Sequence, residues 1–217
     1  MKTLTIEMTL IEAMLGTAPC DPEIYRKFIA EKNKELTKAQ VQDECDTLRR
    51  ISEGTEDPDA VEEVPETITI FHKDENGNPF IYDYLVKGFF KNACSALRNI
   101  SDSKSSKITA FKKKIDGTVM VNPRKLMINA AGPITILQRP LRASTAQGER
   151  IALAASECIP AGSTIECTID VYDDKMYDAV IEWLNYGRVN GLGQWHNSGM
   201  GRFEYKILEE KKGSLCF

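Results

Sequence analysis

The sequence predicts an α+β fold built on an antiparallel sheet. Residues 2–10 alternate between apolar and polar side chains, which is typical of a half-buried strand. Residues 84–97 and 175–186 each place apolar side chains at helical spacing. Turn signals such as Asn76-Gly77 separate short strand-like runs, which indicates hairpins and therefore antiparallel pairing.

The N-terminal third is predicted to contain one strand and an inserted segment. The first strand runs on to a glycine turn at Gly16-Thr17. Residues 18–66 are predicted to form an acidic helical insertion, in which Asp21 and Pro22 suit the start of a helix. Acids and prolines dominate the end of this insertion, which is typical of a flexible connection.

Short strands and two helices are predicted for the rest of the chain. The expected strands cover residues 67–72, 80–82, 108–115, 119–121, 133–137, 151–159, 164–171 and 202–208. Asp116-Gly117 is the predicted turn of a hairpin between the third and the fourth of these strands. Residues 139–148 are predicted to form a mobile hairpin tip, and residues 211–217 a tail.

This order of elements is compatible with a ferredoxin-like split β-α-β arrangement that has its helices on one face of the sheet. Asp173 or Asp174 is the expected cap of the last helix. We therefore expect a single domain over residues 1–217, interrupted by the insertion at 18–66.

The composition excludes several classes of protein. With 42% apolar and 28% charged residues, the chain is an ordinary globular sequence. It contains no apolar run long enough to span a membrane. Glu7 and Glu12 interrupt the N-terminal apolar stretch, which argues against a secretory signal and favours the cytoplasm. Six scattered cysteines without a CxxC pair, and only two histidines, predict no metal site and no cofactor.

Charge is unevenly distributed along the chain. Residues 87–150 contain 13 Lys or Arg against three Asp or Glu, a net charge of +10, whereas residues 1–66 contain eight against 16, a net charge of −8. A basic third inside a chain of net charge −4 suggests a polyanionic partner or a complementary protein surface. A solvated lysine-rich loop is the alternative.

Residues 191–201, GLGQWHNSGMG, form the segment on which the functional prediction rests. Two pairs of glycines, each enclosing an apolar residue, lie between a predicted helix and a predicted strand. This order is the reverse of a dinucleotide-binding fingerprint, and the absence of Gly-Lys-Ser/Thr excludes a P-loop. Trp195 and His196 could stack on an unpaired base, and Arg202 could meet a phosphate. A loop that only packs is the alternative.

Two further segments are candidate contacts for a nucleic acid. Lys87 and Gly88, at a predicted helix start, can offer an ammonium group and backbone amides to a phosphate, and Arg139 and Arg142 can clasp a strand. Solvated lysines beside packing residues are the alternative. The complete set of candidate nucleic-acid-binding residues is Lys87, Gly88, Lys91, Lys112, Lys113, Lys114, Arg139, Arg142, Gly191, Gly193, Trp195, His196, Gly199, Gly201 and Arg202.

The loop at 191–201 resembles, position for position, the G-h-G-x5-G-h-G loop of the RAMP superfamily, the RNA-binding proteins of CRISPR systems. Three weaker segments are similar to backbone subunits of the same superfamily: the first strand with its glycine turn, the helix start at residues 85–91, and residues 156–164, which resemble a hairpin of these subunits. The sequence departs from that pattern at residues 84–86, Tyr-Leu-Val, where paired serines are usual, and in its acidic insertion.

The resemblance implies a ferredoxin-like, RRM-related fold that binds single-stranded, guide-type RNA, or another nucleic acid, as a CRISPR-type or phage-encoded subunit. Homo-oligomers or RAMP-type proteins are the implied partners, and we expect no enzymatic activity. Two alternatives stay open. RAMP processing endoribonucleases usually employ a histidine, so His196 is the candidate acid or base of a metal-independent endoribonuclease. The insertion at 18–66 would instead suit a non-catalytic interaction or self-assembling protein, such as a phage counter-defence factor.

Overall fold

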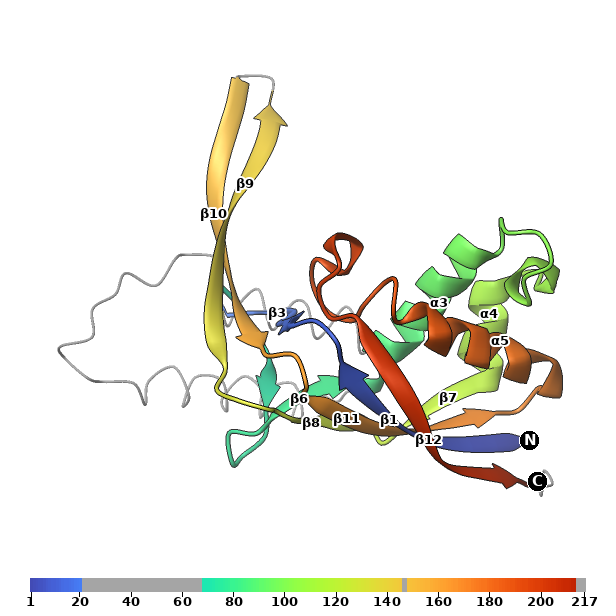
Figure 1. Cartoon of the computed structure of the whole chain (residues 1–217). Coiled ribbons are helices and arrows are strands. Elements are labelled where there is room, and N and C mark those ends of the chain that lie inside the picture. Colours follow the sequence, from blue (N-terminus) through green and yellow to red (C-terminus); the bar gives the residue numbers. More distant parts are fainter. Residues whose placement is uncertain (21–67, 146–147, 214–217) are drawn as a thin grey trace, which may run out of the picture.

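The computed structural model describes residues 1–20, 68–145 and 148–213, and it contains two sheets and three α-helices within these ranges (Figure 1). The strands of the seven-stranded sheet are β1 (Lys2–Leu10), β5 (His72–Lys73), β6 (Pro79–Tyr82), β7 (Val119–Asn122), β8 (Lys125–Asn129), β11 (Thr164–Val171) and β12 (Phe203–Lys212). The strands of the five-stranded sheet are β2 (Met14–Leu15), β3 (Ala18–Pro19), β4 (Ile68–Ile70), β9 (Thr135–Thr145) and β10 (Gly148–Ile159).

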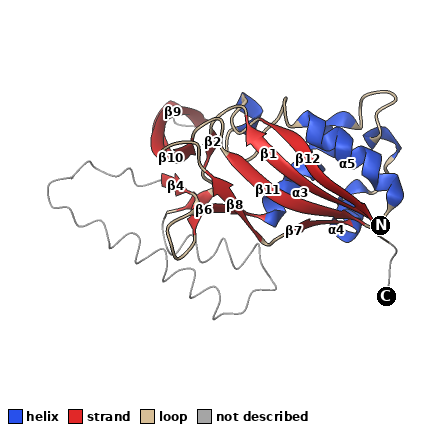
Figure 2. Cartoon of the chain, turned by 60° about the horizontal axis from the view of Figure 1, so that its bottom comes forward, coloured by secondary structure: helices blue, strands red, loops and turns tan. Residues whose placement is uncertain are grey.

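The centre of the molecule has the predicted ferredoxin-like arrangement. The chain order is β1, α3 (Asp83–Leu97), β7, β11, α5 (Asp174–Tyr186) and β12, and the strands lie in the order β12-β1-β11-β7 with antiparallel pairing throughout. Helices α3 and α5 pack against each other and against one face of this sheet (Figure 2). The structure therefore confirms the predicted α+β class and its layered arrangement.

Alternating burial along β1 shows which face of the sheet packs against the helices. In β1 the apolar side chains at every second position are buried, whereas the intervening Thr and Glu side chains are half-buried on the opposite face. Across the interior, Phe90 of α3 and Trp183 of α5 pack with their ring centroids 5.6 Å apart. Asp173 is the N-cap of α5 and accepts a hydrogen bond from the Lys175 amide, as one of the two predicted caps.

The strand predicted at residues 108–115, and its hairpin with residues 119–121, are wrong. Residues 111–118 form α4 (Phe111–Thr118), and only β7 after them is a strand. Phe111 and Ile115 are both buried and lie four residues apart, a spacing that places them on one side of a helix. The Asp116-Gly117 pair lies inside the last turn of α4 rather than in a hairpin turn.

The two strands predicted around Pro160 exist, but they do not form a hairpin with each other. β10 pairs with β9, β2 and β4 in the smaller sheet, whereas β11 belongs to the larger one, so residues 160–163 carry the chain between the two sheets. β9 and β10 instead form a long hairpin, the β9–β10 arm, which projects from the body of the protein (Figure 1). Arg139 and Arg142, predicted at a hairpin tip, lie within β9 opposite Ala154 and Ile151.

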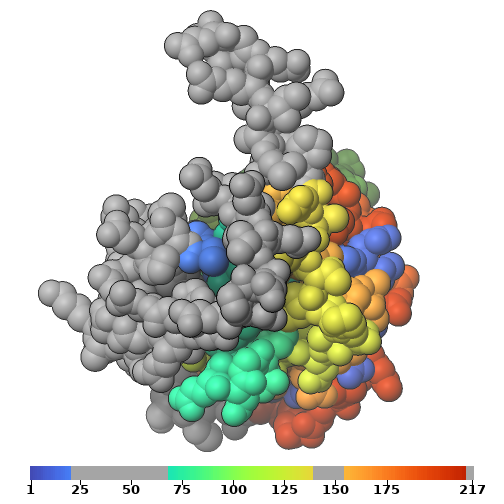
Figure 3. Space-filling view, turned by 90° about the vertical axis from the view of Figure 1, so that its left-hand side faces the viewer, coloured from blue at the N-terminus to red at the C-terminus, as the bar shows by residue number. Residues whose placement is uncertain are grey.

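Two predicted boundaries, the start of the insertion and the end of the last strand, differ by a few residues from the structure. Ala18 and Pro19, predicted as the first residues of the insertion, form β3 and pair with β4, and the predicted helices of the insertion lie outside the described residues. Lys211 and Lys212, predicted as tail, continue β12 and pair with β1. The strand pair around the Asn76-Gly77 turn is confirmed as β5 and β6, and Figure 3 shows this hairpin beside the segment that follows β8.

A buried histidine makes stability dependent on pH. His72 is 5% exposed, stacks on Phe80 and meets the edge of Tyr82 at 4.7 Å. Burial, followed by the nearby charge of Lys125, lowers the pKa of His72 from 6.5 to about 4. The folded state therefore holds this imidazole neutral while the unfolded chain protonates it below its ordinary pKa.

We expect His72 to lower the free energy of unfolding by about 2 kcal/mol between pH 7.5 and pH 5. The loss begins as the pH falls below 6.5 and continues towards pH 4, because protons then bind the unfolded state more strongly. Urea unfolding of the wild type and of His72→Phe at both pH values measures this difference. Equal pH dependence in the two proteins would contradict the prediction.

Candidate nucleic-acid interface

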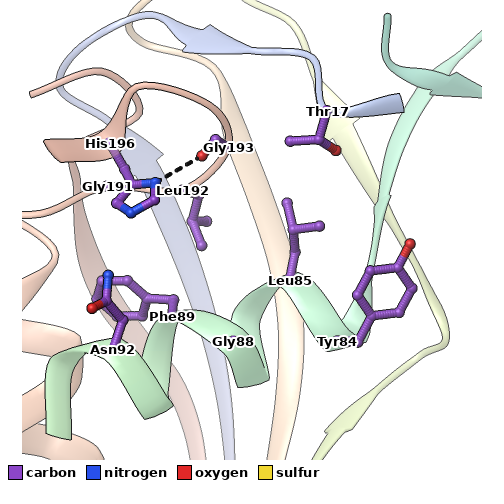
Figure 4. Close-up of a pocket in the computed structure, with 10 residues that line it drawn as sticks. All are labelled: Thr17, Tyr84, Leu85, Gly88, Phe89, Asn92, Gly191, Leu192, Gly193 and His196. Atoms are coloured by element: carbon purple, nitrogen blue, oxygen red, sulfur yellow. Dashed lines mark hydrogen bonds between the residues drawn. The ribbon is translucent and has the colours of Figure 1, made fainter. Parts of the chain in front are cut away.

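Three segments singled out in the sequence meet around one cleft of about 310 Å³ (Figure 4). The segments are the glycine turn after β1, the first turns of α3, and the loop at 191–201; we call the space between them the glycine-loop cleft. Its lining residues are Thr17, Tyr84, Leu85, Gly88, Phe89, Asn92, Gly191, Leu192, Gly193 and His196. A cleft of this size is at the lower end of the range for small-ligand sites.

Close backbone contacts explain the glycines of this loop. Leu192 donates its amide to the Gly201 carbonyl at 2.9 Å, which closes the loop at its base. A Cβ on Gly201 would lie 1.9 Å from the Leu192 carbonyl oxygen, and Gly201 also has a φ of +67°. A Cβ on Gly191 would lie 2.2 Å from the Gly201 carbonyl carbon. Gly191 and Gly201 therefore lie at the base of the loop, where a Cβ on either residue would clash with the backbone opposite it.

The loop is also attached to the segment that follows β1. Gly201 donates its amide to the Ala13 carbonyl at 2.8 Å, and a Cβ on Gly193 would lie 2.6 Å from the Leu15 carbonyl oxygen. Leu15 in turn pairs with Cys158 of β10. The glycine loop, the glycine turn and the base of the β9–β10 arm are therefore neighbours.

His196 lies on the loop side of the cleft, above Phe89 and Asn92 of α3 (Figure 4). Its Nδ1 atom is 3.0 Å from the Gly193 carbonyl oxygen. Donation from Nδ1 to this carbonyl leaves Nε2 of the neutral ring as an acceptor. Trp195, the neighbouring residue at the loop tip, has 37% of its surface exposed but does not line the cleft.

The predicted contact residues of α3 lie on two different faces of the helix. Gly88 lines the cleft, and a Cβ there would meet nothing within 4 Å. Lys87 and Lys91 lie on another face: the Lys87 Nζ atom is 3.5 Å from the Asp116 carbonyl oxygen, and Lys91 forms a 2.5 Å ion pair with the Asp116 carboxylate. These two lysines therefore contact α4 and not the cleft.

The other predicted cations also lie away from the cleft lining. Lys112, Lys113 and Lys114 are exposed on α4. Arg202 forms a 3.0 Å ion pair with Glu12, and its carbonyl accepts the amides of Ile11 and Glu12. Arg202 thus has a structural contact beside the loop. Gly199 is at the end of the short helical turn η2 (His196–Ser198) and does not line the cleft.

An aromatic stack backs one end of the cleft. The Tyr84 ring stacks on Tyr82 at 5.3 Å with an interplanar angle of 16°. The Arg124 guanidinium lies 5.9 Å from the Tyr84 centroid and forms a 3.2 Å ion pair with Asp83. A flat ring beside a guanidinium is a surface on which a nucleobase can stack.

The segment at 156–164 has a structural role in the described residues. Ser156 accepts a 2.7 Å hydrogen bond from Thr69, and the Glu157 carboxylate accepts the Phe71 amide at 2.8 Å and pairs with Lys73 at 2.6 Å. These contacts bind β10 to the β4–β5 chain. The segment therefore holds the smaller sheet in place, and none of it lines the cleft.

Six residues that line the cleft were not among the candidate contacts from the sequence: Thr17, Tyr84, Leu85, Phe89, Asn92 and Leu192. One signal was present, because Leu85, Gly88 and Asn92 lie three and four residues apart and so share one face of a helix. Thr17 comes to the cleft only through tertiary packing, which periodicity does not reveal.

The fold and the cleft define an α+β protein with a ferredoxin-like core, whose glycine loop and first core helix enclose a ring-lined cleft. No protein-family model matches the chain, and no curated protein sequence matches it. Among solved structures, the protein is similar to a chain in the cryo-EM structure of the type III-B Cmr-beta complex bound to cognate target RNA.

This similarity has a TM-score of 0.51 at 10% sequence identity and covers 97% of the present chain. The present chain spans about 60% of the length of that Cmr-beta chain. The similarity therefore concerns the fold, and it agrees with the RAMP-like fold expected from the sequence. Within the described residues, no helix is long and apolar enough to cross a membrane, and no group of three or more potential metal ligands is present.

Proposed function

We propose that the protein binds single-stranded RNA, and that the glycine-loop cleft is where the RNA contacts the body of the protein. The observation that carries this proposal is the convergence of the glycine turn, the start of α3 and the glycine loop around one cleft. These are three of the four segments that resemble the RAMP superfamily. The resemblance is a property of the sequence, whereas the convergence of the three segments in space is an independent observation.

The chemistry of the cleft suits an unpaired base. Tyr84, Phe89 and His196 provide rings, and Asn92 and Thr17 provide hydrogen-bonding groups. Stacking on rings accepts any base, because every base has a π-face, whereas a duplex would not present its bases to a cleft. The lining itself contains no Lys or Arg, so the phosphates would be attracted by basic residues outside it, such as Arg124 beside the Tyr84 ring.

The finer role that we propose is that of a cytoplasmic, CRISPR-type or phage-encoded subunit which carries guide-type RNA without cutting it. The fold-level similarity to a chain of an RNA-bound CRISPR-type complex supports the RNA-binding part of this role. The β9–β10 arm also supports it, because a projecting hairpin beside a cleft can reach along a bound strand or towards a neighbouring subunit.

Fluorescence anisotropy with a labelled single-stranded RNA tests the proposal. We expect saturable binding at low salt that weakens as salt rises, and weaker binding of the matching RNA duplex. The wild type failing to bind any single strand at low salt would contradict the proposal.

A metal-independent endoribonuclease is the second candidate, because the contact between His196 and Gly193 orients the imidazole with Nε2 available as a base. The same samples, incubated in EDTA and analysed on a denaturing gel, separate the two candidates. Intact RNA supports the binding protein, and cleavage that disappears in His196→Ala supports the nuclease.

A further inference from the structure

Strand β12 forms one edge of the seven-stranded sheet (Figure 2). Of the described strands, only β1 pairs with it. At its start the Phe203 amide donates to the Gly187 carbonyl at 2.9 Å, and from Glu204 onwards the outer backbone groups have no described strand partner. An open edge of this length can accept another strand by main-chain hydrogen bonding.

Two exposed apolar side chains lie in the middle of this edge. Ile207 is 39% exposed and Leu208 is 44% exposed. The register with β1 shifts here: Ile207 lies opposite Ile6 and Glu209 opposite Thr5, which makes Leu208 the extra residue of a bulge. The alternation of β12 side chains between the two faces of the sheet therefore shifts by one residue at the centre of the strand.

The bulge places four charged residues on the same face of the strand. Glu204, Lys206, Glu209 and Lys211 lie opposite Thr9, Glu7, Thr5 and Thr3, the alternating residues of β1 that face away from the helices. The ion pair of 2.8 Å between Glu209 and Lys211 agrees with this placement. From one end to the other, the charges on this face read minus, plus, minus, plus.

This charge pattern is complementary to itself when the strand is reversed. An antiparallel pairing centred between Ile207 and Leu208 places Glu204 opposite Lys211 of the second copy, and Lys206 opposite Glu209 of the second copy. The two-fold axis repeats both pairs, and opposite charges at such positions stabilise a sheet. An in-register parallel pairing would instead place like charges together.

We propose that β12 is a homodimer interface, in which the β12 edges of two copies of this chain pair antiparallel about the Ile207-Leu208 centre. The proposal goes beyond RNA binding, and no residue that lines the glycine-loop cleft lies on β12. The exposed pairs that these charges make within one copy, Glu209–Lys211 and Arg188–Glu204, contribute little and can exchange for pairs across the interface. Pairing also covers Ile207 and Leu208.

Sedimentation velocity without RNA, over protein concentrations of roughly 1 to 100 µM, tests the interface. We expect the 24.3 kDa chain to form a species of about twice that mass, and to dissociate as salt rises. Lys206→Glu places Glu opposite Glu209, and Glu209→Lys places Lys opposite Lys206. Each single variant should weaken dimerisation at least ten-fold.

The double variant Lys206→Glu, Glu209→Lys recreates both pairs with reversed polarity, so we expect it to recover most of the dimer. Lys112→Glu, which makes the same charge change on α4, is the matched control and should dimerise as the wild type does. If the protein is a monomer throughout the concentration range, the proposal is overturned. The bulge and the charges would then serve to keep the edge unpaired. Failure of the double variant to recover would overturn the proposal as well.

Discussion

Gly201→Ala is expected to lower the free energy of unfolding by about 4 kcal/mol or more. The added Cβ would lie 1.9 Å from the carbonyl oxygen of Leu192, a backbone atom that cannot move without breaking the base of the loop. The φ of +67° adds strain for any L-residue. Because domains of this size are typically stable by only about 5–15 kcal/mol, the variant should be marginally folded.

Urea unfolding and the yield of soluble protein measure this effect. Gly117→Ala is the matched control, since Gly117 lies in α4, has no neighbour within 4 Å of the added Cβ, and has no positive φ. Alanine is the better helix former by about 1 kcal/mol, so the control should be as stable as the wild type or slightly more stable. An unfolding midpoint for Gly201→Ala close to that of Gly117→Ala would refute our account of the loop.

The glycine loop illustrates what the sequence can and cannot predict. The order of helix, glycine loop and strand was predicted, and the structure confirms it. The backbone segments that the glycines meet were not predictable, because Gly201 meets Leu192 of its own loop and Ala13 from a segment almost 190 residues earlier. Contacts of such sequence separation leave no periodic signal.

The elements that were predicted well are those with a long amphipathic pattern. β1, α3 and α5 each bury one apolar side and carry polar residues on the other side over nine residues or more. Helix α4 was predicted as a strand, because its short run of three lysines between Phe111 and Ile115 fits neither period clearly. The division into two sheets was also missed, since β10 and β11 look like a hairpin in sequence.

The candidate site was predictable in part for a similar reason. Gly88, Gly191, Gly193 and His196 were singled out in the sequence and do line the cleft. The direction of Lys87 and Lys91 depends on Asp116, which α4 brings to them, so a local motif could not reveal that they face away. Their contribution to RNA binding stays a prediction.

Gly88→Glu is expected to reduce the affinity for single-stranded RNA at least ten-fold, about 1.4 kcal/mol. Gly88 lines the glycine-loop cleft, and a side chain there would enter open space, so the substitution fills the cleft and adds a negative charge without a clash. Replacing a helical glycine should also leave the fold intact or stabilise it slightly. Loss of binding would therefore not result from unfolding.

The most direct test of the central claim is the anisotropy titration of Gly88→Glu beside Gly117→Glu. Both substitutions make the same chemical change at an open glycine within a helix, but only Gly88 lines the cleft. If RNA contacts the glycine-loop cleft, Gly88→Glu binds RNA at least ten-fold more weakly while Gly117→Glu stays within about two-fold of the wild type. Equal affinities of the two variants for RNA would contradict the claim.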